Sequence, residues 1–297
     1  MKNILITGGT GLIGSELQKL LKEKGYETAV LSRSRNITDN RTFYWDYEKG
    51  IMDEEALVFA DAIIHLAGEN ISAGRWTPEQ KKRILDSRLK TTLLLAEKIK
   101  ASAKKPEVFI SASAVGYYGS TLSNQIFQED DLAGNDFLAD ITVQWEQSSL
   151  PIEVIGIRRV VLRTGVVLSE KGGALAKMMA PVKLGLGAAL GSGKQMISWI
   201  SLQDLVNLYV FALENPGISG TYNAVAPTPL DNKTFMKTLA HHAHRPFVLP
   251  AVPGFVMKAM YGEMASIVLE GQAVSADKIT AAGFDFRHNT LEDYLNL

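Results

Sequence analysis

The chain has 297 residues, of which 46% are hydrophobic, and its formal net charge at pH 7 is −1. Such a chain can bury a large core, and a nearly neutral charge argues against nucleic acid or an anionic membrane surface as a partner. The absence of cysteine excludes disulfides, thiolate zinc sites and a cysteine nucleophile. No apolar run reaches the roughly 18 residues of a membrane-spanning helix, and a strand begins almost at once, so we expect a cytoplasmic protein without a signal peptide.

The first element is a short apolar run that ends in a glycine-rich turn. Residues 4–7 predict a buried strand, and glycines follow at positions 8, 11 and 14. Gly8 allows a sharp turn, Gly11 allows the backbone to approach a pyrophosphate, and Gly14 allows the next helix to pack close to the sheet. That helix is expected to reach about Lys24 and to direct its N-terminal N–H groups at the phosphates. The pattern favours a dinucleotide site over a purely structural turn.

The end of the second predicted strand, Glu27–Leu31, indicates which dinucleotide binds. In NAD-binding proteins an acidic residue about 20 positions beyond the glycines binds the ribose 2′-hydroxyl. This chain has Ser32, Arg33, Ser34 and Arg35 there, and no carboxylate. The two arginines suit a 2′-phosphate and Ser32 adds a hydroxyl, so the sequence favours NADP over NAD. The alternative is that the arginines are solvated loop charges.

Strand-like and helix-like segments then alternate through the first half, as is typical of a parallel sheet covered on both faces. Further strands are expected at 61–68, 107–113 and 159–164. A long helix is expected from Thr77 to about Lys100, with Thr77 as N-cap, proline at the first helical position and Gln80 placed to complete a capping box. His65 lies inside an apolar strand, so we expect a core residue rather than an acid or base.

After Thr164 the chain becomes rich in glycine loops, followed by a helix at 201–213, a strand at 220–224 and a mostly helical remainder. We therefore predict an α/β fold with two parts. Residues 1–167 and 199–226 form a Rossmann-type doubly wound parallel sheet, and residues 168–198 and 227–297 form a smaller, mostly helical substrate-binding lobe. The three histidines between 241 and 244 are interpreted as a solvated helix end rather than a metal site.

Several longer motifs occur along the chain. They are 7–14 (Thr-Gly-Gly-Thr-Gly-Leu-Ile-Gly), 65–71 (His-Leu-Ala-Gly-Glu-Asn-Ile), 74–77, 86–88, 111–119 (Ser-Ala-Ser-Ala-Val-Gly-Tyr-Tyr-Gly), 162–168, 172–175, 198–201, 262–265 and 282–286. With these motifs the chain resembles the extended short-chain dehydrogenase/reductases of the nucleotide-sugar epimerase and dehydratase type. Within them it is most similar to the branch of epimerase family proteins and NADP-dependent oxidoreductases. The resemblance covers essentially the whole chain, and its mid-chain and C-terminal motifs are more specific than the glycine motif.

The resemblance implies a cofactor site and a substrate-orienting serine. The implied pyrophosphate residues are Gly8, Thr10, Gly11, Leu12 and Ile13. The other implied cofactor residues are Leu66, Ala67, Gly68, Glu69, Arg88 and Ser111, with Thr164, Gly165 and Val166 near the nicotinamide. Ser113 matches the serine that hydrogen-bonds a substrate carbonyl or hydroxyl, and the alternative for Ser111 and Ser113 is that they cap a strand end.

One part of the superfamily pattern is missing. Its working enzymes carry Tyr-x-x-x-Lys on the helix after the serine strand, where lysine lowers a phenol pKa of about 10. None of the nine tyrosines is followed by lysine four residues later, the expected helix at 136–146 has no tyrosine, and no lysine occurs between Lys105 and Lys171. Three interpretations stay open. Tyr117 or Tyr118 replaces the phenol with a charge from Arg75, Arg88 or Arg159; a carboxylate such as Glu69 or Asp140 is the base; or the protein binds NADP without catalysis. The alternative for both tyrosines is loop packing.

We therefore expect an NADP-dependent oxidoreductase or epimerase that acts on a hydroxyl or carbonyl of a small polar substrate such as a sugar. The alternative is a catalytically silent NADP-binding sensor or interaction protein on the same fold. Arg75, Trp76 and Trp199 are candidate substrate-binding residues, because a cation with aromatic rings suits an anionic or ring-bearing ligand. Their alternative is packing between the two parts. The oligomeric state, a homodimer included, stays open.

Overall fold

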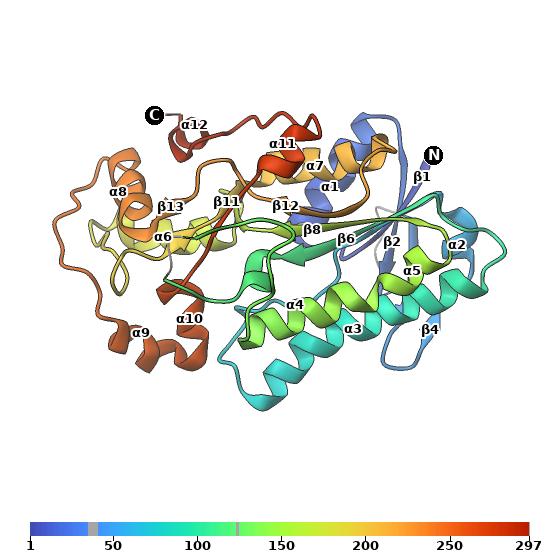
Figure 1. Cartoon of the computed structure of the whole chain (residues 1–297), viewed down its shortest axis with the longest axis horizontal. Coiled ribbons are helices and arrows are strands. Elements are labelled where there is room, and N and C mark those ends of the chain that lie inside the picture. The colour runs from blue at the N-terminus through green and yellow to red at the C-terminus, as the bar shows by residue number, and fades with distance from the viewer. Residues whose placement is uncertain (35–40, 123–124, 297) are drawn as a thin grey trace.

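An eight-stranded sheet forms the centre of the computed structural model, which describes residues 1–34, 41–122 and 125–296 (Figure 1). The strand order is β12-β8-β6-β5-β1-β2-β3-β4, and all neighbours are parallel except β3 and β4. The strands are β1 (Asn3–Thr7), β2 (Glu27–Ser32), β3 (Arg41–Asp46), β4 (Ile51–Met52), β5 (Ala62–His65), β6 (Val108–Ala114), β8 (Arg158–Thr164) and β12 (Gly220–Ala224). This is the doubly wound, Rossmann-type sheet that the sequence predicted.

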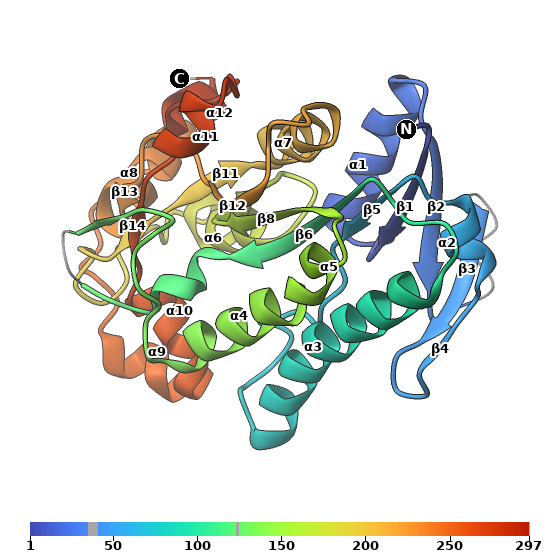
Figure 2. The same ribbon diagram turned by 45° about the vertical axis from the view of Figure 1, so that its right-hand side comes forward.

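Helices cover both faces of the sheet (Figure 2). Because side chains alternate along β1, Ile4 and Ile6 face α1 and α7, whereas Leu5 faces α2, α3 and α5. The central strands are thus buried on both sides, as parallel sheets require. The helices are α1 (Leu12–Glu23), α2 (Glu55–Phe59), α3 (Pro78–Ala101), α4 (Phe137–Ser148), α5 (Leu150–Val154) and α7 (Leu202–Glu214), and α4 packs beside α3.

Most of the rest of the chain lies beyond the carboxyl ends of the strands (Figure 1), whereas a short helix at 277–281 packs beside β12. Its helical elements are α6 (Ala174–Lys183), α8 (Asn232–His242), α9 (Gly254–Tyr261), η2 (Gly262–Ala265), α10 (Ser266–Leu269), α11 (Asp277–Ala281) and α12 (Leu291–Leu295). Short strand pairs lie within this part and at its border with the main sheet: β9 (Val166–Leu168) with β11 (Trp199–Ser201), β10 (Met196–Ile197) with β13 (Leu230–Asp231), and β7 (Ile126–Phe127) with β14 (Ala273–Val274). A hydrogen bond from Gln272 Nε2 to the Val115 carbonyl, 2.6 Å long, attaches the C-terminal region directly to the end of β6.

Two local predictions change in the structure. The strand expected at 61–68 ends at His65, because the next two N–H groups turn inward to the side chain of Thr7. The Thr77 side chain caps α3 as expected, by accepting from the N–H of Gln80 at 3.2 Å. The capping box does not form, since the Gln80 side chain accepts from Arg83 and the Thr77 N–H donates to the Arg75 carbonyl. No helix in the described part of the chain has the length and apolar character to cross a bilayer.

Candidate functional site

The turn after β1 has a geometry that requires glycine at two positions. Gly8 has a φ of +67°, and a Cβ there would lie 2.9 Å from the backbone of Leu66. A Cβ on Gly14 would lie 2.4 Å from the carbonyl oxygen of Gly8, so the first turn of α1 rests directly on the loop. The Gly11 N–H closes the turn by donating to the same carbonyl at 3.0 Å. The structure thus shows the sharp turn and the close helix packing for which these glycines were singled out.

The N-terminus of α1 is open at this turn. Gly11 is the N-cap and offers no side-chain hydrogen bond, and the first turn of the helix contains no acidic residue. The first N–H groups of a helix have no partner within the helix itself. Thr10 and Gly11 are exposed, and Leu12 and Ile13 are half-buried. These N–H groups and the positive end of the helix dipole are therefore accessible to an anion.

The end of β2 carries a cation and hydroxyls. Ser32 is half-buried, and its Oγ accepts the N–H of Ser34 at 3.0 Å. Arg33 is exposed, with its guanidinium carbon 5.9 Å from the ring centroid of Tyr47. Arg35, the second candidate for a 2′-phosphate, lies outside the described residues. Residues 32–34 contain no carboxylate that would favour a free 2′-hydroxyl.

Thr7 fastens the loop after β5 to the end of β1. Its Oγ1 accepts the N–H groups of Leu66 and Ala67, both at 3.1 Å, so its own hydrogen is directed at Nδ1 of His65, 2.7 Å away. Nε2 of His65 then donates to Thr92 Oγ1 at 3.0 Å. Burial lowers the pKa of His65 to about 3, and the charge of a nearby arginine adds to this. His65 is therefore a neutral core residue, as the sequence predicted.

Arg88 lies beneath the next part of this loop. Its Nη1 donates to the carbonyls of Glu69 and Ile84 at 3.1 and 3.0 Å, and its guanidinium carbon is 5.1 Å from the ring centroid of Trp145. A Cβ on Gly68 would approach this guanidinium to 3.2 Å. Burial lowers the pKa of Arg88 to about 10, opposed by the charge of Glu69, so the side chain stays cationic at neutral pH. It places a positive charge under the exposed Gly68.

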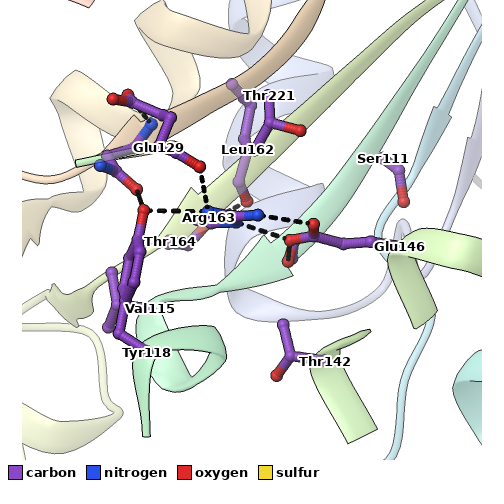
Figure 3. A network of polar contacts seen from close by, with 12 residues as sticks. Ser111, Val115, Tyr118, Glu129, Thr142, Glu146, Leu162, Arg163, Thr164 and Thr221 are labelled. Atoms are coloured by element: carbon purple, nitrogen blue, oxygen red, sulfur yellow. Dashed lines mark hydrogen bonds and ion pairs between the residues drawn. The ribbon is translucent and has the colours of Figure 1, made fainter. Parts of the chain in front are cut away.

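The serines at the end of β6 have different surroundings. Ser113, 4% exposed, donates its Oγ hydrogen to Glu146 Oε1 on α4 at 2.6 Å. Arg163 on β8 holds the same carboxylate with two hydrogen bonds, from Nε at 2.9 Å and from Nη2 at 3.0 Å (Figure 3). Burial lowers the pKa of Arg163, but Glu146 outweighs burial and raises it overall, so the pair is ionic. Ser111 is also buried and bonds to the Ala112 carbonyl at 3.0 Å.

The two neighbouring tyrosines differ in what their hydroxyls contact. Tyr118 is 3% exposed, and its hydroxyl donates to Asn223 Oδ1 at 2.6 Å and accepts from Arg163 Nη1 at 3.0 Å. Burial raises its pKa to about 12. Tyr117 is half-buried, and its hydroxyl has no hydrogen-bond partner among the described residues. Its ring centroid lies 3.4 Å from the guanidinium carbon of Arg163, so a fixed positive charge rests on its face.

The strand β8 ends beside the C-terminal region. Thr164 Oγ1 donates to the Leu162 carbonyl at 3.1 Å, and a Cβ on Gly165 would lie 2.5 Å from the Ser198 carbonyl. Val166 then pairs with Trp199, joining β9 to β11. All three residues expected near the nicotinamide, Thr164, Gly165 and Val166, are half-buried at the carboxyl edge of the sheet.

A pocket of about 150 Å³ lies between the start of α4 and the C-terminal region. Its lining residues are Trp76, Ser120, Asp136, Phe137, Leu138, Glu263, Ser266 and Glu270. Of the three expected substrate residues, only Trp76 reaches it. Arg75 donates instead to the carbonyls of Ala259 and Met260 at the end of α9. Trp199 is fully buried and bonds through Nε1 to the Thr228 carbonyl, so its place is in the core.

Two of the charged residues that the sequence offered for proton transfer make other contacts in the structure. Arg159 binds Glu153 Oε2 at 2.8 Å, and Asp140 is an exposed residue that accepts from Gln144. Neither lies in the Ser113 network. Glu146 and Arg163, which do, were missed. A usable signal was Arg163 itself, because an arginine inside an apolar parallel strand needs a buried partner.

The comparisons with known proteins agree with this architecture. The family model described as the NAD dependent epimerase/dehydratase family matches residues 4–224, and a domain of unknown function (DUF1731) matches residues 252–296. The epimerase family protein YfhF of Bacillus subtilis (strain 168) is 39% identical over 292 residues, which are 98% of this chain and 95% of that protein. Among solved structures, human epimerase family protein SDR39U1 (isoform 2) with NADPH has a TM-score of 0.87 at 33% identity, covering 99% of this chain and 97% of its own.

A second similar structure is the nucleoside-diphosphate sugar epimerase of Corynebacterium glutamicum. It has a TM-score of 0.81 at 31% identity and covers 99% of this chain but 57% of its own. The family match extends from β1 to β12, the whole of the main sheet, and includes the glycine turn and the Ser113 strand. The chain therefore belongs to the NAD dependent epimerase/dehydratase family.

Proposed function

We propose that the chain is an NADP-dependent oxidoreductase or epimerase that acts on a hydroxyl or carbonyl group of a small polar substrate. The observation that carries the proposal is the open N-terminus of α1 at the glycine turn, combined with a basic, carboxylate-free end of β2. An open helix start suits a pyrophosphate, and Arg33 with Ser32 suits an additional 2′-phosphate. The human relative with NADPH supports the same choice of nucleotide.

The cofactor would lie along the carboxyl edge of the sheet. In this proposal the N–H groups of Thr10, Leu12 and Ile13 bind the pyrophosphate, because the Gly11 N–H already closes the turn. The loop at 66–69 borders the adenosine-side ribose and phosphates above Arg88. Ser111 and residues 164–166 border the nicotinamide. We also keep the division into a nucleotide-binding part (1–167 and 199–226) and a substrate-binding part (168–198 and 227–297) as a proposal, because the pocket is lined from both.

The proton must be handled without the usual tyrosine and lysine pair. When bound, NADPH supplies a hydride to a substrate carbon. We assign the proton of the substrate oxygen to Tyr117, because its hydroxyl is free of partners among the described residues and Arg163 supplies a positive charge at its ring. Ser113 gives its hydrogen to Glu146, so its lone pairs stay available to accept a hydrogen bond from a substrate hydroxyl or from the hydroxyl that forms when a carbonyl is reduced. Tyr118 is left out, because both roles of its hydroxyl are taken internally.

A second candidate function is NADP binding without catalysis. It is favoured by the hydrogen bond that commits Ser113 to Glu146 and by the missing Tyr-x-x-x-Lys. In this case the nucleotide site would serve a sensor or an interaction protein. The two candidates share the nucleotide site and differ only in chemistry.

The nucleotide site is tested by calorimetry on nucleotide-stripped protein with NADPH and NADH. We expect NADPH to bind more tightly, and Arg33→Ser to weaken NADPH by about tenfold, the loss of one charge-assisted contact, with little effect on NADH. Arg245→Ser, a change at an exposed arginine in the C-terminal region, is the matched control. Equal affinities for both nucleotides in the wild type would refute the NADP assignment.

Catalysis is tested by incubating the protein with NADPH and a broad panel of carbonyl compounds. The enzyme proposal expects NADPH oxidation that falls by about 100-fold or more in Tyr117→Phe, the range of general acid–base catalysis, and falls also in Ser113→Ala. Tight NADPH binding without oxidation of any compound would support the silent candidate instead.

A further inference from the structure

The pocket beside α4 differs from a nucleotide-sugar site in its charge. Three of its lining residues are carboxylates, Asp136, Glu263 and Glu270. The neighbouring Lys81 forms an ion pair with Glu263 and lies 4.7 Å from the ring centroid of Phe137. Glu270 has no side-chain partner within the described ranges. The lining therefore offers hydrogen-bond acceptors and negative charge, but no unpaired cation for a phosphate.

The start of α4, which could otherwise bind a phosphate, is already occupied. Asp136 is its N-cap: Oδ1 accepts the N–H of Ala139 at 2.9 Å, and Oδ2 accepts the N–H of Ser120 at 2.6 Å. A carboxylate at a helix N-terminus satisfies its N–H groups and offsets its dipole. A second anion at this position would meet like charge in a partly enclosed site.

The aromatic wall and the volume indicate the size of the ligand. Trp76 and Phe137 lie edge to face with ring centroids 5.0 Å apart, and Trp76 is fixed by a hydrogen bond from Nε1 to the Ile71 carbonyl at 2.9 Å. The volume of about 150 Å³ is that of a cavity that admits one benzene-sized molecule. An apolar wall with convergent carboxylates and the Ser266 hydroxyl suits one ring that bears hydroxyl groups.

The pocket and the Ser113 network lie along one stripe of α4. Leu138 lines the pocket, Glu146 binds Ser113, and Thr142 lies between them at the same helical spacing. Gly116 packs on this stripe, since a Cβ there would lie 3.3 Å from Leu138 Cβ and 3.7 Å from Thr142 Oγ1. Eight residues of helix span about 12 Å. The pocket is thus placed to hold the end of a substrate whose reacting group lies nearer Tyr117 and Ser113.

We infer that the non-reacting end of the substrate is a single uncharged ring bearing hydroxyl groups, and that the pocket rejects nucleoside diphosphates. This inference rests on the proposed function, because it assigns the pocket to the substrate of the NADPH-dependent reaction. It differs from the chemistry named for the Corynebacterium glutamicum relative, which is a nucleoside-diphosphate sugar epimerase. Glu270 is the side chain that accepts hydrogen bonds from the ring hydroxyls.

The test is saturation-transfer NMR on the NADPH-loaded protein with three probes, myo-inositol, methyl α-glucoside and UDP-glucose. We expect the two uncharged rings to bind at least about tenfold more tightly than UDP-glucose. Glu270→Gln should weaken the rings by about three- to tenfold, because a neutral amide oxygen replaces a charged hydrogen-bond acceptor. Glu97→Gln, at an exposed glutamate of α3, should not weaken them. Glu270→Lys should shift the preference toward UDP-glucose.

Three results would overturn the inference: UDP-glucose binding as tightly as the rings, no saturation transfer to either ring, or no effect of Glu270→Gln. Calorimetry with NADPH on the same samples separates the two proposals. Loss of NADPH binding would remove the proposed function itself. NADPH binding together with tight UDP-glucose binding would remove only the inference about the pocket.

Discussion

Replacing Tyr118 with phenylalanine deletes one buried hydroxyl and leaves the ring in place. That hydroxyl bonds to Asn223 Oδ1 at 2.6 Å and to Arg163 Nη1 at 3.0 Å. Asn223 is fully buried, so its Oδ1 would lose its donor at a cost of about 1–3 kcal/mol. Arg163 Nη1 keeps the carbonyl of Glu129, also at 3.0 Å, so its loss is smaller. We expect the free energy of unfolding to fall by about 2–4 kcal/mol in total.

The matched variant is Tyr117→Phe, which removes a half-buried hydroxyl that has no partner in the described structure. We expect its free energy of unfolding to stay within about 0.5 kcal/mol of the wild type. Urea unfolding and thermal melts measure both variants, and the Tyr118→Phe melting temperature should fall by about 3–6 °C for a chain of this length. Equal stabilities of the two variants, or a larger loss in Tyr117→Phe, would refute the division of roles between the tyrosines.

Three further changes test other parts of the structure. Gly14→Ala places a Cβ 2.4 Å from a carbonyl oxygen of the glycine turn, so calorimetry should show NADPH affinity reduced by at least about tenfold. Burial raises the pKa of Asp61, but hydrogen bonds from Lys104 and two backbone N–H groups lower it further, to about 2. The contribution of ionised Asp61 to the free energy of unfolding is therefore complete above pH 4 and is lost as the pH falls through 2. Urea unfolding should show Asp61→Asn less stable than the wild type by about 2 kcal/mol at pH 7 and equal to it near pH 2. Arg163→Met leaves the mostly buried carboxylate of Glu146 without its cation and should cost about 3–5 kcal/mol in urea unfolding, with partial recovery when Glu146→Gln is added.

The sequence predicted the elements whose signals are local. The glycine turn, the helix after it and the capping of α3 by Thr77 depend on residues within a few positions of one another. The helix over 201–213 was predicted for the same reason, and Ser201 caps it by accepting the N–H of Asp204 at 3.0 Å. The parallel sheet followed from the alternation of these elements, because few other folds bury short apolar strands between helices.

The parts that sequence did not predict depend on distant partners. Glu146 and Arg163 are 17 residues apart and meet only because α4 packs across β6 and β8. Trp199 is of a residue type that is common in ligand pockets, but its strand pairs with β9 and places it in the core. Arg75 contacts carbonyls 184 and 185 residues away. The spacing of residues in one sequence does not predict such contacts, because the packing of whole helices and strands creates them.

The neutral imidazole between Thr7 and Thr92 has a consequence for how activity depends on acidity. His65 orients the Thr7 hydroxyl that holds the N–H groups of Leu66 and Ala67, and with a pKa of about 3 it gains no proton between pH 5 and 8. The hydrogen bonds that hold the loop after β5 therefore keep one arrangement over that whole pH interval. A rate that changes between pH 5 and 8 should then be traced to the substrate or to groups elsewhere, and nucleotide affinity should stay nearly level apart from the ionisation of the 2′-phosphate itself.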